Sequence, residues 1–221
     1  MEIETLKKIR TVFPGVFVVI LAFYYHITSH TSNFLSMKCP ENEISLSSIS
    51  LPSCIILLIG IIYYVFSIRD ILWKPLMKKI WDCIINGLLS IAELEDVSVN
   101  SKERDRVRKT VFYYFIDKDD TLKEKSKLIK FNGAILSCLA DAILILFVYI
   151  VIVVVVAIVK KNLMFNSLVI PVILFVFCIP SVFIVQNKHL KLVNDQIDFI
   201  KTNYSKECAK KMSQVIGKNG D

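Results

Sequence analysis

The chain has 221 residues, of which 54% are hydrophobic and 21% charged; its formal net charge is +7 and its mean hydropathy is +0.56. A typical soluble domain is about half apolar and about a quarter charged. Four buried helices of a soluble protein are the alternative, but such helices rarely run to this length and would need a much larger polar shell than this chain carries. The apolar excess falls in four uncharged stretches, at residues 11–37, 44–68, 142–159 and 162–187.

The first stretch predicts a helix that crosses a membrane. A bilayer core of about 30 Å needs roughly 20 apolar helical residues, and residues 11–37 exceed that length. The basic start also fits a signal peptide, but no small-x-small cleavage pattern follows the apolar run. We therefore expect a retained helix, with Tyr24 and Tyr25 at its outer interface. Residues 44–68 predict a second span.

The insert at residues 69–131 is predicted to form a set of amphipathic helices. Apolar residues recur at helical spacing from Ile71 to Leu89. Asn100 and Glu103 have the spacing of a capping box for a second helix, which "DKDD" at 117–120 then interrupts. Thr121 and Glu124 offer a further capping box, so a third helix is expected to run through Lys130 into span three.

The third stretch carries one acid, Asp141, at its inner end, and extends back to Phe131. Lys130 and Lys160 bracket about 44 Å of helix. Asp141 then lies either at the cytoplasmic rim, in a structural role, or about 6 Å from the midplane, in an oligomer contact or a water-filled path. Ser137 lies one turn earlier and can share that contact.

The fourth stretch contains Pro171 and Pro180, each of which frees a backbone carbonyl and can kink the helix. The following tail, residues 188–221, is predicted to be helical. Its apolar residues have coiled-coil spacing, so the tail either pairs with another chain or packs against residues 69–131. The candidate oligomerisation residues are Leu190, Val193, Ile197, Ile200 and Tyr204.

The distribution of charge predicts the orientation in the membrane. With both termini in the cytoplasm, 24 of the 27 Lys and Arg residues lie inside and 3 outside, as the positive-inside rule requires. The sequence thus predicts an all-α integral membrane protein. Its expected parts are spans one and two (1–68), a cytoplasmic helical insert (69–131), spans three and four (132–187) and a cytoplasmic C-terminal helix (188–221).

The segment "SKERDRVRK", residues 101–109, is a candidate basic partner-binding surface. It suits phosphate, anionic lipid or an acidic partner. A solvated helix face with internal ion pairs, such as Asp105 with Arg108, is the alternative. No aromatic residue interleaves here, so the segment does not directly support nucleic acid binding. Its basic residues are Lys102, Arg104, Arg106, Arg108 and Lys109.

We expect no cofactor and no metal. None of the six cysteines forms a CxxC pair, and a disulfide framework is not expected in the cytoplasm. The segment at 117–120 fails as a calcium loop, because Leu122 and Leu128 stand where glycine and glutamate are needed. His26 and His30 lie one turn apart without a third ligand nearby. With Asp141 the one acid within the spans and no catalytic motif present, we expect no enzyme.

The overall layout of short outer loops, a helical cytoplasmic insert and a stretch "VFYYFIDKDDTLKEKSKLIKFNGAILSCLADAI" at 111–143 resembles four-span membrane components of bacterial anti-phage defence systems. The resemblance implies a homo-oligomer that permeabilises the inner membrane or senses events there with a soluble cytoplasmic partner. An effector or sensor is thus the first hypothesis. A non-conducting anchor or scaffold for a soluble partner is the second, and a small transporter, which lacks the expected internal repeat, is the third.

Overall fold

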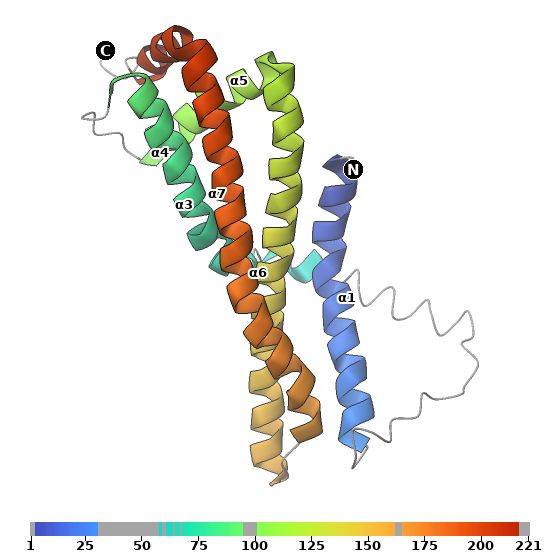
Figure 1. The fold of residues 1–221 in the computed structure, drawn as a ribbon. Helices are drawn as coiled ribbons and strands as arrows, with labels where there is room; N and C mark the ends of the chain where they lie inside the picture. The colour runs from blue at the N-terminus through green and yellow to red at the C-terminus, as the bar shows by residue number, and fades with distance from the viewer. Residues whose placement is uncertain are drawn as a thin grey trace. The chain divides into compact units, whose positions relative to one another are not determined.

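The computed structural model describes residues 3–30, 58, 61–63, 65, 66, 68–94, 101–161 and 165–216, and these residues are almost entirely helical with no strand. Most of the predicted second span, the cap at Asn100, and Cys39 and Cys54 lie outside the described residues. The described elements are α1 (Ile3–His30), α3 (Asp70–Ile91), α4 (Ser101–Val107), the π-helical turn η2 (Arg108–Phe112), α5 (Tyr113–Lys118), α6 (Asp120–Lys160) and α7 (Phe165–Ile216) (Figure 1).

The chain forms two compact units. Unit 1 comprises residues 1–73 and 134–184, and unit 2 comprises residues 74–133 and 185–221. Three of the described helices, α1, α6 and α7, are long and apolar enough to cross a membrane. This finding agrees with the predicted spans one, three and four.

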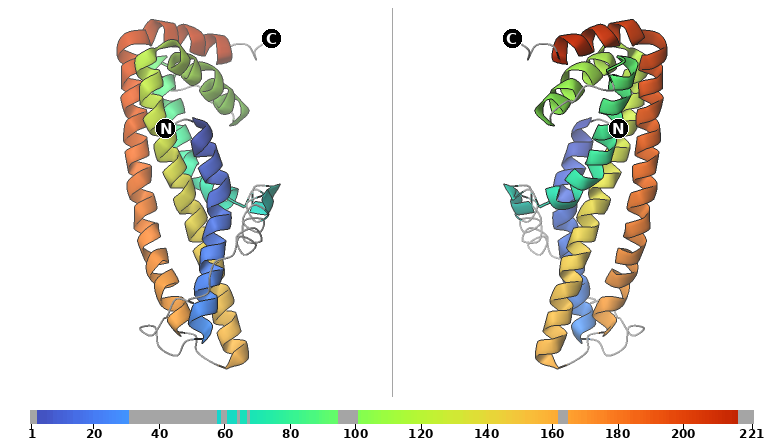
Figure 2. Two further views of the ribbon diagram at one scale, coloured as in Figure 1. Left: turned by 90° about the vertical axis from the view of Figure 1, so that its right-hand side faces the viewer. Right: turned by 90° about the vertical axis from the view of Figure 1, so that its left-hand side faces the viewer.

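Unit 1 is built from α1, the apolar part of α6 and the first part of α7, which run alongside one another (Figures 1 and 2). Its core cluster joins Leu21 of α1 to Tyr63 and to Ile145 and Leu146 of α6. Near the far end of α1, the Thr28 and Ser167 hydroxyls, both buried, lie 2.7 Å apart and share a hydrogen bond. This contact satisfies two polar groups that burial would otherwise penalise.

The surfaces of the two units differ in a way that indicates a membrane around unit 1. Among the large hydrophobic side chains that the described residues expose, only Tyr113, Leu128 and Phe131 belong to unit 2. All the others, for example Phe147 and Phe177 at 56% and 68% exposure, belong to unit 1. A water-soluble unit rarely exposes so many large apolar side chains, whereas a lipid-facing one must.

Two prolines in unit 1 each leave a main-chain carbonyl for a side chain on another element. A helical carbonyl accepts from the N–H four residues on, and proline has none. The Arg10 carbonyl, four residues before Pro14, accepts from Arg69 Nη2 at 2.6 Å. Tyr149 Oη donates in the same way to the Ser167 carbonyl, four residues before Pro171, at 3.2 Å. These contacts satisfy backbone groups that lipid cannot.

Unit 2 is built from α3, α4, η2, α5, the first turns of α6 and the later part of α7 (Figures 1 and 2). Apart from Tyr113, Leu128 and Phe131, the large apolar side chains among its described residues are buried or half-buried, in contrast to those of unit 1. Phe115 is the largest of its fully buried side chains. Helices α3 and α7 approach closely at Gly87, where an added Cβ would lie 2.7 Å from Cγ2 of Ile197.

Replacement of Gly87 by alanine is expected to destabilise unit 2 by about 1–3 kcal/mol, because the new methyl group overlaps Ile197. The intrinsic gain from alanine in a helix, about 0.5–1 kcal/mol, is smaller. Thermal unfolding of the detergent-solubilised protein measures the change. In the double variant Gly87→Ala/Ile197→Ala, the methyl fills space that Ile197 left, so the two substitutions should together cost less than their sum. Simple additivity would contradict the overlap.

Local chemistry explains the ends of these helices. The α3 helix ends at Ile91, and Glu93, two residues further on, has a φ of 56°. The Leu94 and Glu93 amides donate to the Leu89 and Ser90 carbonyls at 3.0 and 3.2 Å. These two bonds form the Schellman arrangement that satisfies the last carbonyls of a helix.

The predicted capping box at Thr121 and Glu124 is wrong. Asp119, in extended conformation, caps α6 instead, and its Oδ1 accepts from the Leu122 amide at 3.0 Å. The carboxylate suits the position because the first turn of a helix leaves its amides unsatisfied.

Candidate functional site

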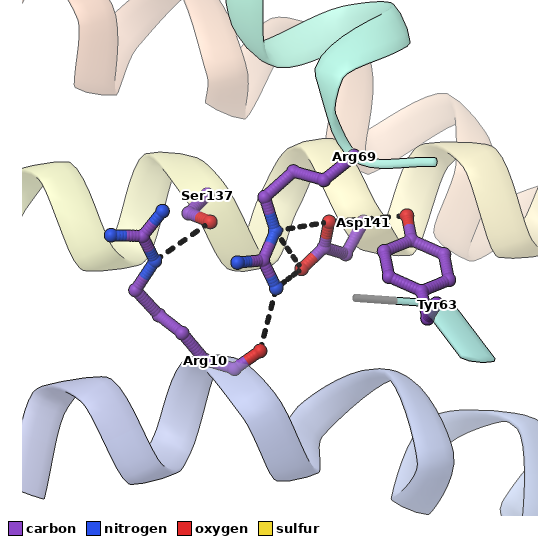
Figure 3. Close-up of polar contacts among 5 residues, drawn as sticks. All are labelled: Arg10, Tyr63, Arg69, Ser137 and Asp141. Atoms are coloured by element: carbon purple, nitrogen blue, oxygen red, sulfur yellow. Dashed lines mark hydrogen bonds and ion pairs between the residues drawn. The ribbon is translucent and has the colours of Figure 1, made fainter. Parts of the chain in front are cut away.

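A buried carboxylate with four hydrogen bonds lies at the centre of the polar part of unit 1 (Figure 3). Asp141 of α6 has no solvent exposure. Arg69 Nε donates to Asp141 Oδ1 at 2.9 Å and to Oδ2 at 3.0 Å, and Arg69 Nη2 donates to Oδ2 at 2.6 Å. Tyr63 Oη donates to Oδ1 at 3.1 Å. A bidentate guanidinium contact of this kind is both strong and directional.

The same arginine reaches a third element. Arg69 Nη2 also donates to the main-chain carbonyl of Arg10 in α1, the carbonyl that Pro14 leaves without its helical donor. One guanidinium therefore joins α1 to α6 and to the segment before α3. The Arg69 side chain is 17% exposed, so most of its charge is balanced by Asp141 and not by water.

Arg10 makes a second, neighbouring connection between α1 and α6. Its Nε donates to Ser137 Oγ at 3.2 Å, and its guanidinium carbon lies 5.1 Å from the centroid of the Trp73 ring. Ser137, like Asp141, is fully buried and lies one turn earlier on α6. The two candidate polar residues of the sequence thus lie together, and each contacts a different arginine. We refer to Arg10, Tyr63, Arg69, Ser137 and Asp141 as the charge clamp.

The geometry of the charge clamp favours the structural role for Asp141. Its oxygens accept four hydrogen bonds from Arg69 and Tyr63, which leaves little capacity to bind an ion or a water. Sequence reasoning placed Arg69 only in the count of cytoplasmic charges and missed Arg10 and Tyr63 as partners. The available signal was the position of basic residues at the inner ends of the first two spans, level with an acid at the inner end of the third.

The predicted basic segment lies largely in ion pairs within unit 2. Arg104 Nη2 lies 3.1 Å from Asp82 Oδ1, and Arg108 Nη2 lies 2.8 Å from Asp105 Oδ1. The second pair confirms the predicted Asp105–Arg108 contact. Lys109 also reaches Asp105, at 3.4 Å. The Lys102 side chain lies outside the described residues, and Arg106 is exposed.

An open depression of about 850 Å³ lies between α3 and α4 in unit 2. Its charged lining residues are two cations and two acids, so it carries no net charge for an anionic ligand. Trp81 supplies an aromatic wall whose ring is in contact with the Arg108 guanidinium, at 4.3 Å from the ring centroid. The lining residues are Lys78, Trp81, Asp82, Ile85, Asn86, Arg104 and Asp105.

The candidate oligomerisation residues of the tail lie in the core of unit 2. Val193, Ile197 and Ile200 are at most 7% exposed, and Leu190 and Tyr204 are half-buried. The structure thus shows the packing alternative, in which the tail covers residues 69–131 of its own chain. A coiled coil with another chain through this face is not compatible with this packing.

A polar cluster holds the end of α7 against α5. The α7 helix breaks at Tyr204, where φ is −134° and ψ is 19°, and its last turns change direction there (Figure 2). Tyr204 Oη donates to Asp119 Oδ2 at 2.8 Å, and Tyr114 Oη donates to Glu207 Oε1 at 2.7 Å. Lys118 Nζ lies 2.5 Å from Glu207 Oε2.

These contacts predict that the end of α7 becomes less ordered at acidic pH. The Tyr204 hydroxyl, followed by the Leu122 amide, lowers the pKa of Asp119, and Lys118, followed by Tyr114, lowers the pKa of Glu207. A carboxyl with a lowered pKa stabilises the folded state above its ordinary pKa, and this stabilisation disappears as the pH falls through its folded value.

We expect residues 205–216 to exchange their amide hydrogens faster below about pH 4, after correction for intrinsic rates. The paired substitution Asp119→Asn/Glu207→Gln removes both titrating groups and should flatten this pH dependence. Equal protection of these residues at pH 3 and pH 7 in the unchanged protein would contradict the role of the two carboxylates.

The described residues contain no group of three or more metal-ligating side chains. His26 lies on α1, and the side chain of His30 lies outside the described residues. His189 is buried in unit 2, where burial lowers its pKa, and its Cε1 would lie 3.3 Å from a Cβ added at Gly133. Cys83, Cys138, Cys178 and Cys208 are free thiols.

Comparison of the chain with protein-family models, with curated proteins and with solved structures found no match.

Proposed function

We propose that the chain is an oligomeric membrane effector or sensor in which a cytoplasmic helical unit passes a signal to membrane-spanning helices. Two observations support the proposal. Unit 1 has the apolar surface of a lipid-embedded protein, and unit 2 has the buried core and charged surface of a water-soluble one. The resemblance of the sequence layout to four-span components of bacterial anti-phage defence systems adds a trigger associated with infection to the proposal.

The proposed topology has four spans with both termini and unit 2 in the cytoplasm of a bacterial cell. Residues 44–68 supply the second span, by their apolar sequence. The 24 Lys and Arg residues on the inner side, against 3 on the outer side, support this orientation.

The observation that carries the proposal is the sharing of helices between the units. The boundary between the units falls inside α6, between Gly133 of unit 2 and Ala134 of unit 1. It also falls inside α7, between Ile184 of unit 1 and Val185 of unit 2. Within the described residues, α6 and α7 are therefore each continuous across the boundary between the two units. In the proposal, a displacement of the first turns of α6 is carried along the same helix to Ser137 and Asp141.

In the proposed mechanism, the charge clamp holds the resting state. Arg69 binds Asp141 on α6 and the Arg10 carbonyl on α1 at the same time, so rotation or translation of α6 must break these contacts together. A ligand or partner shifts the equilibrium only by the difference in its affinity for the two states. The proposal assigns no catalytic step and no cofactor to the chain.

The test is membrane integrity in cells that express the chain. We expect Asp141→Asn, which removes the charge but keeps the size of the side chain, to increase dye entry or depolarisation in the absence of a trigger. The matched control is Asp195→Asn, an exposed acid of unit 2, which should behave as the unchanged protein. Absence of leakage from every variant, with or without phage infection, would rule out a membrane-permeabilising effector.

A non-conducting anchor or scaffold is the second candidate. The satisfied oxygens of Asp141 favour it, because they provide no lining for an ion path, and the depression between α3 and α4 offers a place for a soluble partner. Capture of a soluble protein with the full chain, lost in Trp81→Ala and retained in Lys109→Ala, would support this function if leakage never occurs. A small transporter has no specific observation in its favour.

A further inference from the structure

Unit 2 has an apolar and basic surface on the first turns of α6 that its own core does not need. Leu128 and Phe131 are 58% and 46% exposed. They are three positions apart in the helix (i and i+3), so they lie on one face of it. Apart from Tyr113, they are the exposed large hydrophobic side chains among the described residues of unit 2.

Lysines lie beside this apolar face. On the helix surface, Lys127 is next to Phe131, and Lys123 and Lys130 lie further round on the same side. The side chains of all three lysines are exposed. Lys127 contacts Glu124, but both side chains are at least 60% exposed, and such a surface pair is weak. Lys123 and Lys130 have no ion-pair partner among the described residues. The segment from Lys123 to Phe131 has four lysines and one glutamate, so its net charge is positive.

The length of α6 places this face at the boundary of a bilayer. The helix is uninterrupted from Asp120 to Lys160, and the part from Phe131 to Lys160 measures about 44 Å at 1.5 Å per residue. A bilayer with its headgroup regions is about 40–45 Å thick. When Lys160 lies at the outer surface, Phe131 and Lys130 therefore lie at the level of the inner headgroups.

We propose that Lys127, Lys130, Leu128 and Phe131 form a binding surface for anionic phospholipid of the cytoplasmic leaflet. The aromatic ring and Leu128 pack among the headgroups, and the ammonium groups contact the phosphates, as aromatic and basic anchors do at membrane interfaces. An acidic protein partner would require charge but would not explain the two exposed apolar side chains at headgroup level. The proposal rests on the membrane-spanning role of α6 given above.

This placement also fixes the depth of the charge clamp. Asp141 is ten residues beyond Phe131 on the same helix, or about 15 Å deeper. About 7 Å of that distance is headgroup region, so Asp141 lies within the hydrocarbon core, on its cytoplasmic side. The lipid surface thus anchors the helix that carries the buried acid, at the level where unit 2 begins.

The test is photo-crosslinking of the full chain in nanodiscs that contain phosphatidylcholine with one-fifth phosphatidylglycerol. A benzophenone amino acid replaces Phe131, or Phe147 as a positive control within the apolar part of α6, or Tyr113 as the third exposed apolar position of unit 2. Mass spectrometry identifies the adducts. We expect lipid adducts at positions 131 and 147 and none at 113, with phosphatidylglycerol enriched above its mole fraction at 131 alone.

Lysine substitutions test the charge. Lys127→Gln and Lys130→Gln should each lower the phosphatidylglycerol preference at position 131, by up to about fivefold for a lysine close to the surface. Lys201→Gln, an exposed lysine of α7, is the matched control and should leave the preference unchanged.

Each other outcome overturns a defined part of the proposal. Adducts at position 131 without preference for phosphatidylglycerol, or with preference that survives both glutamine substitutions, would exclude anionic-lipid recognition. A crosslinked dimer at position 131 would show that a second copy occupies the face, and absence of any adduct there would show that nothing does. Failure of position 147 to capture lipid would instead contradict the membrane-spanning role of α6, and with it the proposed function.

Discussion

Replacement of Arg69 by alanine should destabilise unit 1 by about 3–5 kcal/mol, because Asp141 would keep its buried position and lose its counter-charge. Asp141 is fully buried and Arg69 is 17% exposed, so water can restore little of the lost interaction. The substitution also removes the donor to the Arg10 carbonyl, which adds a second unsatisfied group. Thermal unfolding in detergent, monitored by the rate at which a thiol reagent labels Cys138, measures the effect.

Two control variants separate the buried pair from charge in general. The double variant Arg69→Met/Asp141→Leu removes both charges and should recover most of the lost stability, since paired apolar replacement of a buried ion pair is often neutral. Lys109→Ala breaks a pair whose members are 66% and 52% exposed and should change stability by less than about 1 kcal/mol. Equal stability of Arg69→Ala and the unchanged protein would show that the charge clamp does not hold unit 1 together.

Introduction of a lysine at Ile197 should unfold unit 2 instead of merely separating subunits. Ile197 is 7% exposed and packs at Gly87, so the substitution removes a buried apolar side chain and places an ammonium group in an apolar site. The loss should exceed about 3 kcal/mol. Hydrogen exchange across residues 185–216 and light scattering in detergent together distinguish loss of structure from loss of subunits.

Asp198→Lys provides the matched control for this experiment. Asp198 follows Ile197 in the chain and is exposed, so the same new charge should leave the exchange pattern of unit 2 nearly unchanged. A smaller particle with intact protection in Ile197→Lys would contradict the structure and would return the tail to the intermolecular coiled coil.

The local and compositional features of this molecule could be predicted from its sequence. The apolar runs gave α1, α6 and α7 as long helices, and the spacing of Asp105 and Arg108 gave their ion pair. These features depend on neighbours within one or two helical turns. The position of the α6 cap was wrong by two residues because Asp119 and Thr121 are both good capping residues, and local sequence does not decide between them.

The charge clamp could not be predicted, because its members are far apart in the chain. Arg69 and Asp141 are separated by 72 residues, and Arg10 and Ser137 by 127. Nothing in the spacing around Asp141 indicates which of several basic residues it meets. The heptad pattern of the tail had the same ambiguity, since a stripe containing Ile197 and Ile200 fits an intramolecular or an intermolecular groove equally well.

The contact between Arg69 and α1 depends on the missing amide hydrogen of Pro14. Any other residue at position 14 would return an amide to the helix, and that amide would compete with Arg69 for the Arg10 carbonyl. A change that makes α1 more regular would therefore weaken its attachment to the rest of unit 1. At this residue, a more complete set of backbone hydrogen bonds within α1 would come at the expense of the contact between α1 and Arg69, although the proline side chain itself carries no polar atom.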